Sequence, residues 1–143
     1  MDYEKYMRMA LAEARCAEDD GEVPIGAVIV CKDRVIAKAH NQTELLHDVT
    51  AHAEMIAITT AANYLDAKYL TDCTIFVTVE PCVMCAGALA WSQIGEVVYG
   101  ATDSKRGFTT YSDKILHPKT KVVVGVLADE CEALVKSFFA KRR

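Results

Sequence analysis

Residues 74–85 read Thr74-Ile-Phe-Val-Thr-Val79-Glu-Pro81-Cys82-Val-Met-Cys85, a strand-like run followed directly by two cysteines at a helix start. The apolar and β-branched residues before Glu80 are typical of a buried strand. Pro81 then favours the first turn of a helix, because proline lacks the N–H group that would be unpaired there. Cys82 and Cys85 lie three positions apart near the helix start, so both sulfur atoms face the same way. This pattern is typical of a metal site or of a dithiol redox site, and taken alone it favours neither.

A second pair of chemically active residues, His52 and Glu54, lies upstream at the start of another helix-like segment. His52, Cys82 and Cys85 together provide three ligands that suit zinc and leave its fourth tetrahedral position open. Glu54 is too close to His52 along the chain to be a comfortable fourth ligand, but its carboxylate can reach a water molecule in that position. The residues therefore predict a hydrolytic site with one zinc ion per chain.

The order His-x-Glu followed by Pro-Cys-x-x-Cys is the signature of zinc nucleobase deaminases. Beyond this signature, the chain resembles the bacterial tRNA-specific adenosine deaminases over nearly its whole length. The stretches that carry the resemblance are residues 21–28 (GEVPIGAV), 40–41 (HN), 50–54 (TAHAE) and 80–88 (EPCVMCAGA). The resemblance implies a three-layer α/β/α fold of the cytidine deaminase-like type. It also implies deamination of adenosine to inosine at the wobble position of a tRNA anticodon, and a homodimer whose second chain helps to enclose the active site.

The resemblance also implies roles for individual residues. It supports the three zinc ligands named above, and it makes Glu54 the residue that carries protons from water to the ring and to the departing amine. It places Asn41 in the nucleoside pocket, together with Ala53. An asparagine at this point of the chain is also typical of a turn, so that interpretation of Asn41 stays open.

The composition is that of an ordinary globular protein. The chain has 143 residues, of which 52% are hydrophobic and 25% are charged, so we expect a single zinc-dependent deaminase domain over residues 1–143. No apolar run approaches the length of a membrane span, and the first residues are acidic and polar where a secretion signal would be basic and then apolar. We therefore expect a cytoplasmic protein without a membrane partner.

The remaining cysteines do not have ligand spacing. Cys16, Cys31, Cys73 and Cys131 are scattered singly among apolar neighbours. In a chain expected to stay in a reducing compartment, such cysteines are typically reduced and partly buried. We therefore expect no disulfide framework.

Charge is divided unevenly along the chain, although the net charge is only −4. Residues 1–100 hold 7 Lys or Arg against 15 Asp or Glu, whereas residues 101–143 hold 9 against 5. The last third can therefore meet a polyanion such as tRNA, although solvated surface lysines produce the same composition. The side chains expected to contact RNA are Lys105, Arg106, Lys119, Lys121 and the tail Lys141-Arg142-Arg143.

Hydrophobic periodicity predicts an alternation of helices and strands. The expected helices cover residues 3–16, 51–63, 82–92 and 129–141, and the expected strands cover 26–31, 35–40, 74–79, 95–100 and 122–126. Thr50 is expected to cap the helix 51–63 through its hydroxyl group. Residues 101–121 show no period and are expected to form a long loop, which in a compact domain is often functional. This order predicts an α/β protein with a central sheet of about five strands and helices on both faces.

Two other functions agree with the same residues. A deaminase of a free base or nucleoside, such as guanine, adenine or cytosine, uses the same chemistry on a different substrate. A non-catalytic zinc or dithiol redox module needs only the metal ligands. Residues 107–112 and 119–121 depart from the pattern of the tRNA enzymes, so the sequence alone leaves the choice between tRNA and a free base open.

Overall fold

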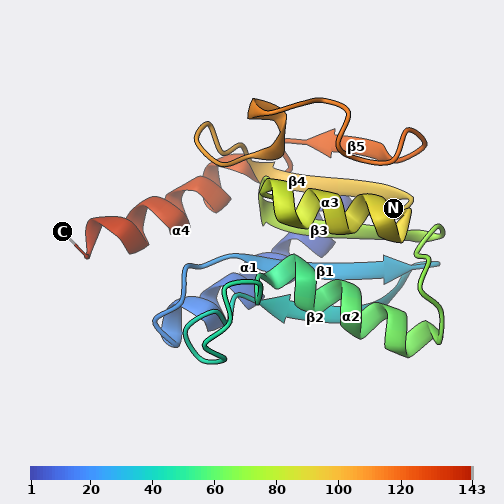
Figure 1. The fold of residues 1–143 in the computed structure, drawn as a ribbon. Coiled ribbons are helices and arrows are strands. Elements are labelled where there is room, and N and C mark those ends of the chain that lie inside the picture. The colour runs from blue at the N-terminus through green and yellow to red at the C-terminus, as the bar shows by residue number, and fades with distance from the viewer. Residues whose placement is uncertain (143) are drawn as a thin grey trace.

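The computed structural model describes residues 1–142 and contains a five-stranded sheet between two layers of helices (Figure 1). The predicted three-layer α/β fold is therefore confirmed. The elements in chain order are α1 (Tyr3–Asp19), β1 (Gly26–Cys31), β2 (Arg34–His40), α2 (Ala53–Leu65), β3 (Cys73–Val79), α3 (Val83–Ser92), β4 (Glu96–Ala101), the short 3-10 helix η1 (Phe108–Thr110), β5 (Lys121–Val124) and α4 (Ala128–Ala140).

The strand order β2-β1-β3-β4-β5 brings several chain segments to one edge of the sheet. β1 is antiparallel to both of its neighbours, whereas β3, β4 and β5 are parallel to one another. The carboxyl ends of β3 and β4 therefore lie at the same edge as the end of β2 and the start of β1. Ligands of open α/β sheets bind at the carboxyl ends of the parallel strands. We call the side of the sheet where these strand ends lie the site edge, and the side where β3, β4 and β5 begin the opposite edge.

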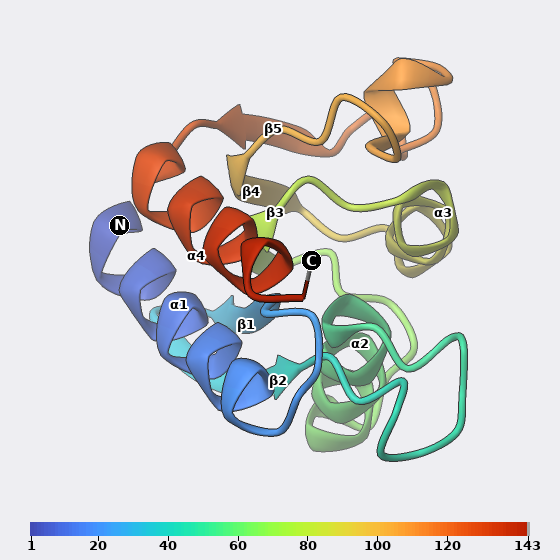
Figure 2. The same cartoon turned by 90° about the vertical axis from the view of Figure 1, so that its left-hand side faces the viewer.

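Each face of the sheet is covered by two helices (Figures 1 and 2). α2 and α3 cover the face on which Ile29, Ile75 and Val77 are buried. α1 and α4 cover the other face, where Val28 and Phe76 are buried among residues of both helices. Burial of such side chains stabilises the fold by about 1.5–3 kcal/mol each. The packing against the first face holds α2 and α3 side by side, with both N-termini at the site edge.

The predicted cap of α2 is wrong. α2 begins at Ala53, and the hydroxyl of Thr50 donates to Asp48 Oδ1 at 2.7 Å instead of capping the helix. The first N–H group of α2 is instead satisfied by a residue outside the helix, because Ala53 N donates to Asn41 Oδ1 at 2.9 Å. The loop 101–121 is more ordered than expected, since it contains η1 and a β-bridge between Gly107 and Cys82.

Among the helices of residues 1–142, none is both long enough and apolar enough to cross a bilayer.

Candidate active site

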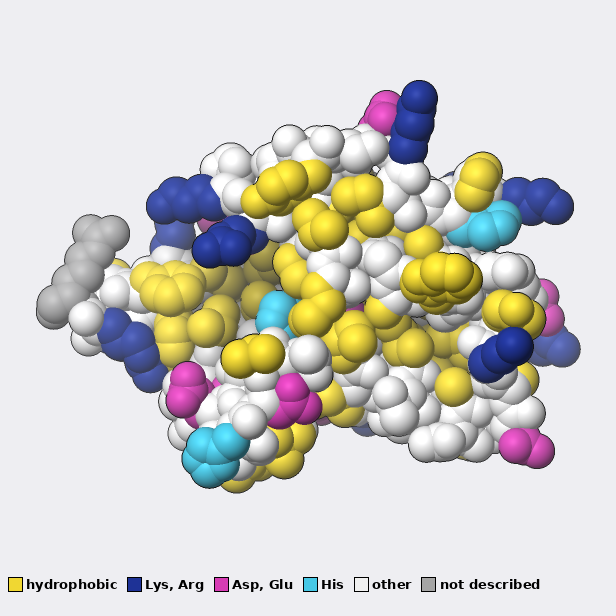
Figure 3. All heavy atoms as spheres, viewed as in Figure 1, with side chains coloured by type: hydrophobic (Ala, Val, Ile, Leu, Met, Phe, Trp, Pro, Cys, Tyr) yellow, Lys and Arg dark blue, Asp and Glu magenta, His cyan; other side chains and the backbone are white. Residues whose placement is uncertain are grey.

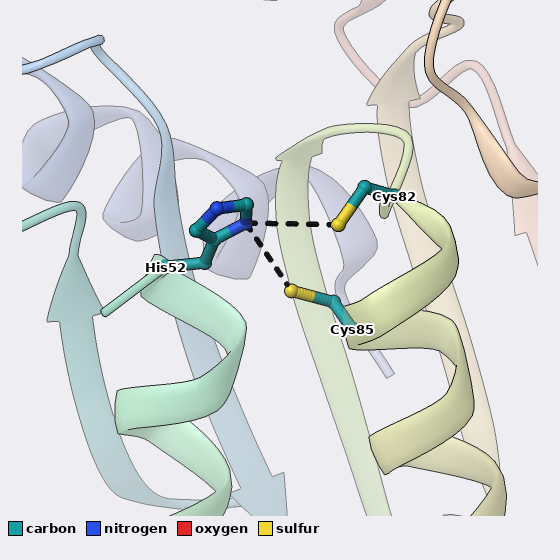
Figure 4. A group of neighbouring side chains, drawn as sticks. All are labelled: His52, Cys82 and Cys85. Carbon is teal, nitrogen blue, oxygen red and sulfur yellow. Dashed lines mark hydrogen bonds between the residues drawn. The ribbon is translucent and has the colours of Figure 1, made fainter. Parts of the chain in front are cut away.

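His52, Cys82 and Cys85 come together where α2 and α3 begin (Figure 4). His52 is the N-cap residue of α2, and Cys82 is the N-cap residue of α3, whose first turn contains Cys85. One potential ligand atom from each residue lies within 4.8 Å of the other two. The three residues predicted as ligands from the sequence are thus neighbours in space, although His52 is far from the cysteines along the chain.

The distances between these atoms suit a zinc ion. His52 Nδ1 lies 3.7 Å from Cys82 Sγ and 3.5 Å from Cys85 Sγ. Zinc bonds of about 2.1 Å to nitrogen and 2.3 Å to sulfur, at tetrahedral angles, place such atoms about 3.6 Å apart. The residues therefore fit zinc, with Nδ1 of His52 as the nitrogen that faces the sulfur atoms.

The two thiols differ in their protonation. Hydrogen bonds from Cys85 and His52 lower the pKa of Cys82 to about 4. The pKa of Cys85 is raised, first by its hydrogen bond to Cys82 and then by burial. The pair therefore carries one negative charge at neutral pH. Because metal ligation requires thiolates, a zinc ion that binds both sulfur atoms displaces the proton of Cys85.

Glu54 lies in the first turn of α2 with only 3% of its surface exposed. Its Oε1 atom has no hydrogen-bond partner within residues 1–142. A buried oxygen without a partner costs about 1–3 kcal/mol, so its presence indicates that a ligand or a reaction requires it. Burial raises the pKa of Glu54 to about 7. A carboxyl group with such a pKa can both accept and release a proton near neutral pH.

Asn41 and Ala53, both predicted near the substrate, are also neighbours in the structure. Asn41 follows β2 and is 6% exposed, and its Oδ1 accepts the hydrogen bond from the Ala53 N–H group. The N–H group of Ala53 is thus used within the protein. This hydrogen bond uses the oxygen of the Asn41 amide and does not involve its NH₂ group.

The sequence analysis missed Glu80, a buried residue just before Pro81. Its Oε1 accepts a hydrogen bond from Asp103 N at 3.1 Å. Its Oε2 accepts bonds from the N–H and hydroxyl groups of Thr109 at 3.0 and 2.7 Å. A Cβ atom at Gly107 would lie 2.3 Å from the Glu80 carboxylate carbon, so only glycine fits there. Glu80 therefore holds the loop after β4 against Cys82.

A second missed carboxylate, Glu22, holds the loop before α2. Its oxygens accept hydrogen bonds from the Thr43 hydroxyl and from the N–H groups of Glu44 and Leu45. Burial opposes ionisation of Glu22, but these hydrogen bonds outweigh it and lower the pKa of the carboxyl group below its ordinary value. Each of the two loops beside the ligands is therefore anchored by one buried glutamate.

The basic residues predicted to contact RNA lie at both edges of the sheet. Lys105 and Arg106 follow β4 at the site edge, and Arg142 reaches Gly21 in the loop before β1, at the same edge. Lys121 begins β5 and pairs with Glu96 at 3.7 Å, at the opposite edge. Lys119 lies close to Lys121 along the chain, and Arg143 lies outside the described residues.

The fold and the His-Cys-Cys group together define a hydrolytic deaminase of the cytidine deaminase-like class. The model of the MafB19-like deaminase family matches residues 1–143, and the chain belongs to this family, together with the tRNA-specific adenosine deaminases. The tRNA-specific adenosine deaminase of Aquifex aeolicus (strain VF5) is 43% identical over 148 residues, which cover 100% of this chain and 97% of that protein.

Two solved structures show the same architecture. One, from work on A-to-I editing by tRNA:A34 deaminases, has a TM-score of 0.85 at 40% identity and covers 91% of this chain and 98% of that chain. The other is a guanine deaminase from Nitrosomonas europaea, with a TM-score of 0.80 at 27% identity, covering 96% and 84%. The fold is therefore shared by enzymes whose substrates differ.

Proposed function

We propose that this protein is a zinc-dependent enzyme that deaminates adenosine to inosine at the wobble position of a tRNA anticodon. The observation that carries the proposal is the placement of the unpartnered Glu54 Oε1 beside three atoms spaced for zinc. The choice of tRNA is supported by the relatives named as tRNA-specific adenosine deaminases and by the structural likeness to a tRNA:A34 deaminase. A tRNA substrate also implies a cytoplasmic location.

The reaction replaces the amino group on C6 of adenine with the oxygen of water and releases ammonia. When bound by His52, Cys82 and Cys85, zinc supplies a Lewis acid that lowers the pKa of water to about 7. Glu54 Oε1 accepts one proton from the attacking water and delivers it to N1 of the ring. It then takes the second proton from the oxygen that is now bonded to C6 and passes it to the amine, which leaves as ammonia. The NH₂ group of Asn41 donates to the bound nucleoside, and its bond to Ala53 fixes its direction.

A cavity of about 420 Å³ at the site edge supports an RNA substrate. It lies between the end of α4 and the loops before β1 and α2, and its lining includes Thr43, Phe138 and Arg142. The Arg142 guanidinium lies 3.6 Å from the centre of the Phe138 ring. Figure 3 shows Lys and Arg side chains around this end of the molecule, beside a hollow with hydrophobic side chains. Cations beside an aromatic surface are typical of contacts to phosphates and unstacked bases.

These contacts make tRNA binding dependent on salt. We expect the double variant Lys141→Ala/Arg142→Ala to bind tRNA more weakly. The slope of log affinity against log salt concentration should also be smaller by about 1.4, because each of the two lost phosphate contacts to a single strand contributes about 0.7. Fluorescence anisotropy with labelled tRNA over a salt series measures both quantities. The variant Lys119→Ala/Lys121→Ala removes the same charge and is expected to change them less, because Lys121 lies at the opposite edge. Equal effects of the two variants would contradict this assignment.

A second candidate function is deamination of a free purine, which the structural likeness to a guanine deaminase favours. Incubation of the purified protein with tRNAs that carry adenosine at the wobble position, and separately with guanine, adenine and cytosine, distinguishes the two. The proposed function predicts inosine in the tRNA and no release of ammonia from the free bases. Rapid release of ammonia from a free base, without inosine in any tRNA, would support the second function.

We also propose that the enzyme acts as a homodimer, as the resemblance implies. α3 consists almost entirely of apolar residues, although only one side of it packs on the sheet. Its outer side leaves Trp91 85% and Val83 40% exposed. Nothing lies within 4 Å of the position that a Cβ atom at Gly87 would occupy. A helix that is apolar all round is usually buried, and a second copy of this chain would cover α3 beside the metal ligands.

The dimer is tested by placing a charge on the outer side of α3. We expect Trp91→Glu to sediment as a monomer in analytical ultracentrifugation at concentrations at which the wild-type protein is a dimer, because a buried unpaired carboxylate opposes association. Tyr111→Glu places the same charge on another exposed aromatic side chain, outside α3, and should leave the dimer intact. A monomeric wild-type protein would show that no such interface forms.

A further inference from the structure

Two cysteines outside the His52, Cys82 and Cys85 group lie opposite each other on neighbouring strands of the sheet. Cys31 ends β1 and Cys73 begins β3, and the antiparallel register pairs them directly. Residues paired in this way point to the same face, and their Cα atoms are about 4.5–5.5 Å apart. This separation lies within the range of about 4.4–6.8 Å that a disulfide spans. Both thiols are free in the structure.

The two thiols differ in their access to solvent. Cys31 is partly exposed, whereas Cys73 is buried. Burial raises the pKa of Cys73 to about 12, and the neighbouring Cys31 contributes to the rise. A soluble oxidant therefore reaches Cys31 first, and Cys73 is a second thiol held beside it in the protein interior.

The pair is separate from the zinc-binding group. Cys73 begins β3, and the chain follows the whole strand to Val79 before it reaches Pro81 and Cys82 at the site edge. At about 3.3 Å per residue, the strand alone spans about 20 Å. Cys31 lies directly before the hairpin turn Lys32-Asp33, where the end of the strand can adjust more easily than its centre. Neither thiol has a part in the deamination chemistry.

We propose that Cys31 and Cys73 are a redox modification site that forms a reversible disulfide on exposure to hydrogen peroxide. The thiol of Cys31 attacks peroxide, which breaks the O–O bond and gives a sulfenic acid and one water. The sulfur of Cys73 then attacks the sulfenic sulfur, so that an S–S bond forms and a second water leaves. The two thiols lose two electrons and two protons in total, and one peroxide is reduced to two waters. A dithiol reductant reverses the modification by thiol–disulfide exchange.

The test treats the zinc-loaded full-length protein with hydrogen peroxide, blocks the remaining thiols under denaturing conditions, and identifies linked peptides by mass spectrometry. We expect one linked pair, Cys31 with Cys73, which disappears after treatment with dithiothreitol. The link should persist in Cys16→Ser and be absent in Cys31→Ser. Oxidation of the exposed Cys16 without any Cys31–Cys73 link would overturn the proposal, as would a link confined to Cys82 and Cys85.

A second measurement follows the sulfenic acid. In Cys73→Ser the resolving thiol is missing, so dimedone should label Cys31 several-fold more than in the wild-type protein. Equal labelling of the two proteins would overturn the proposed order of steps. Circular dichroism checks the fold of the variants. Cys31→Ser alters only a partly exposed strand end, so the test of the link does not depend on replacing the buried Cys73.

Discussion

Replacing Cys85 with alanine is expected to weaken zinc binding at least about 100-fold and to abolish deaminase activity. Changes to residues that only support metal ligands already cost about 10–100-fold in affinity or activity. Loss of a ligand removes more, because Cys85 is buried and water cannot easily replace its sulfur. Inductively coupled plasma mass spectrometry of the purified variant measures the metal, and inosine formation in tRNA measures the activity.

The matched control for this change is Cys131→Ala. Cys131 is also buried, but it lies on α4 on the opposite face of the sheet. Both changes therefore remove a buried sulfur atom and leave a similar cavity, which costs stability through lost packing. The control should keep about one zinc per chain. Full zinc content in Cys85→Ala would show that the ligand assignment is wrong.

Replacing Glu54 with glutamine is expected to lower the rate of the chemical step by about 10²–10⁴-fold, the usual contribution of a positioned proton-transfer group. Glutamine has almost the same shape, but its amide cannot take a proton from water and return it to the amine. The zinc content should not change, because Glu54 does not belong to the group of three ligand atoms. Single-turnover kinetics with saturating enzyme separates this loss from a change in tRNA binding.

Glu4→Gln provides the control for charge, because Glu4 is an exposed glutamate in the first turn of α1, which covers the other face of the sheet from α2. It should retain most of the wild-type rate. If Glu54→Gln turned over as fast as this control, another residue would have to carry the protons.

The sequence could single out the His52, Cys82 and Cys85 group and Glu54 because their signals are local. His52 and Glu54 are two positions apart, Cys82 and Cys85 are three apart, and each pair stands at a helix start. The local patterns alone do not show how the two pairs meet. The resemblance to the deaminases implied it, because in their fold the two ligand helices lie side by side, and α2 and α3 do pack in this way on one face of the sheet.

The features that were missed all involve partners far apart in the sequence. Thr50 has the right position and chemistry for a cap of α2, yet the group that satisfies the first N–H is Asn41, which reaches it from the end of β2. Glu80 accepts hydrogen bonds from Asp103 and Thr109, which are separated from it in the sequence by the whole of α3 and β4. Such contacts follow from the strand order, which periodicity does not determine.

The basic residues illustrate the same limit. Their number in the last third of the chain is visible from the composition, but their place in the fold is not. Arg106 and Lys121 are both basic residues after Gly100, yet the parallel arrangement of β4 and β5 puts them at opposite edges of the sheet. The strand topology therefore decides which of these charges can contact an RNA at the site edge.

Mapping inosine along a tRNA that carries adenosine at the wobble position, after incubation with the zinc-loaded protein, is the most direct test of the proposed function. We expect inosine at the wobble position, no conversion of other adenosines, and one ammonia for each inosine formed. The proposed function would be contradicted by a tRNA that stays unmodified while the same preparation releases ammonia from free guanine.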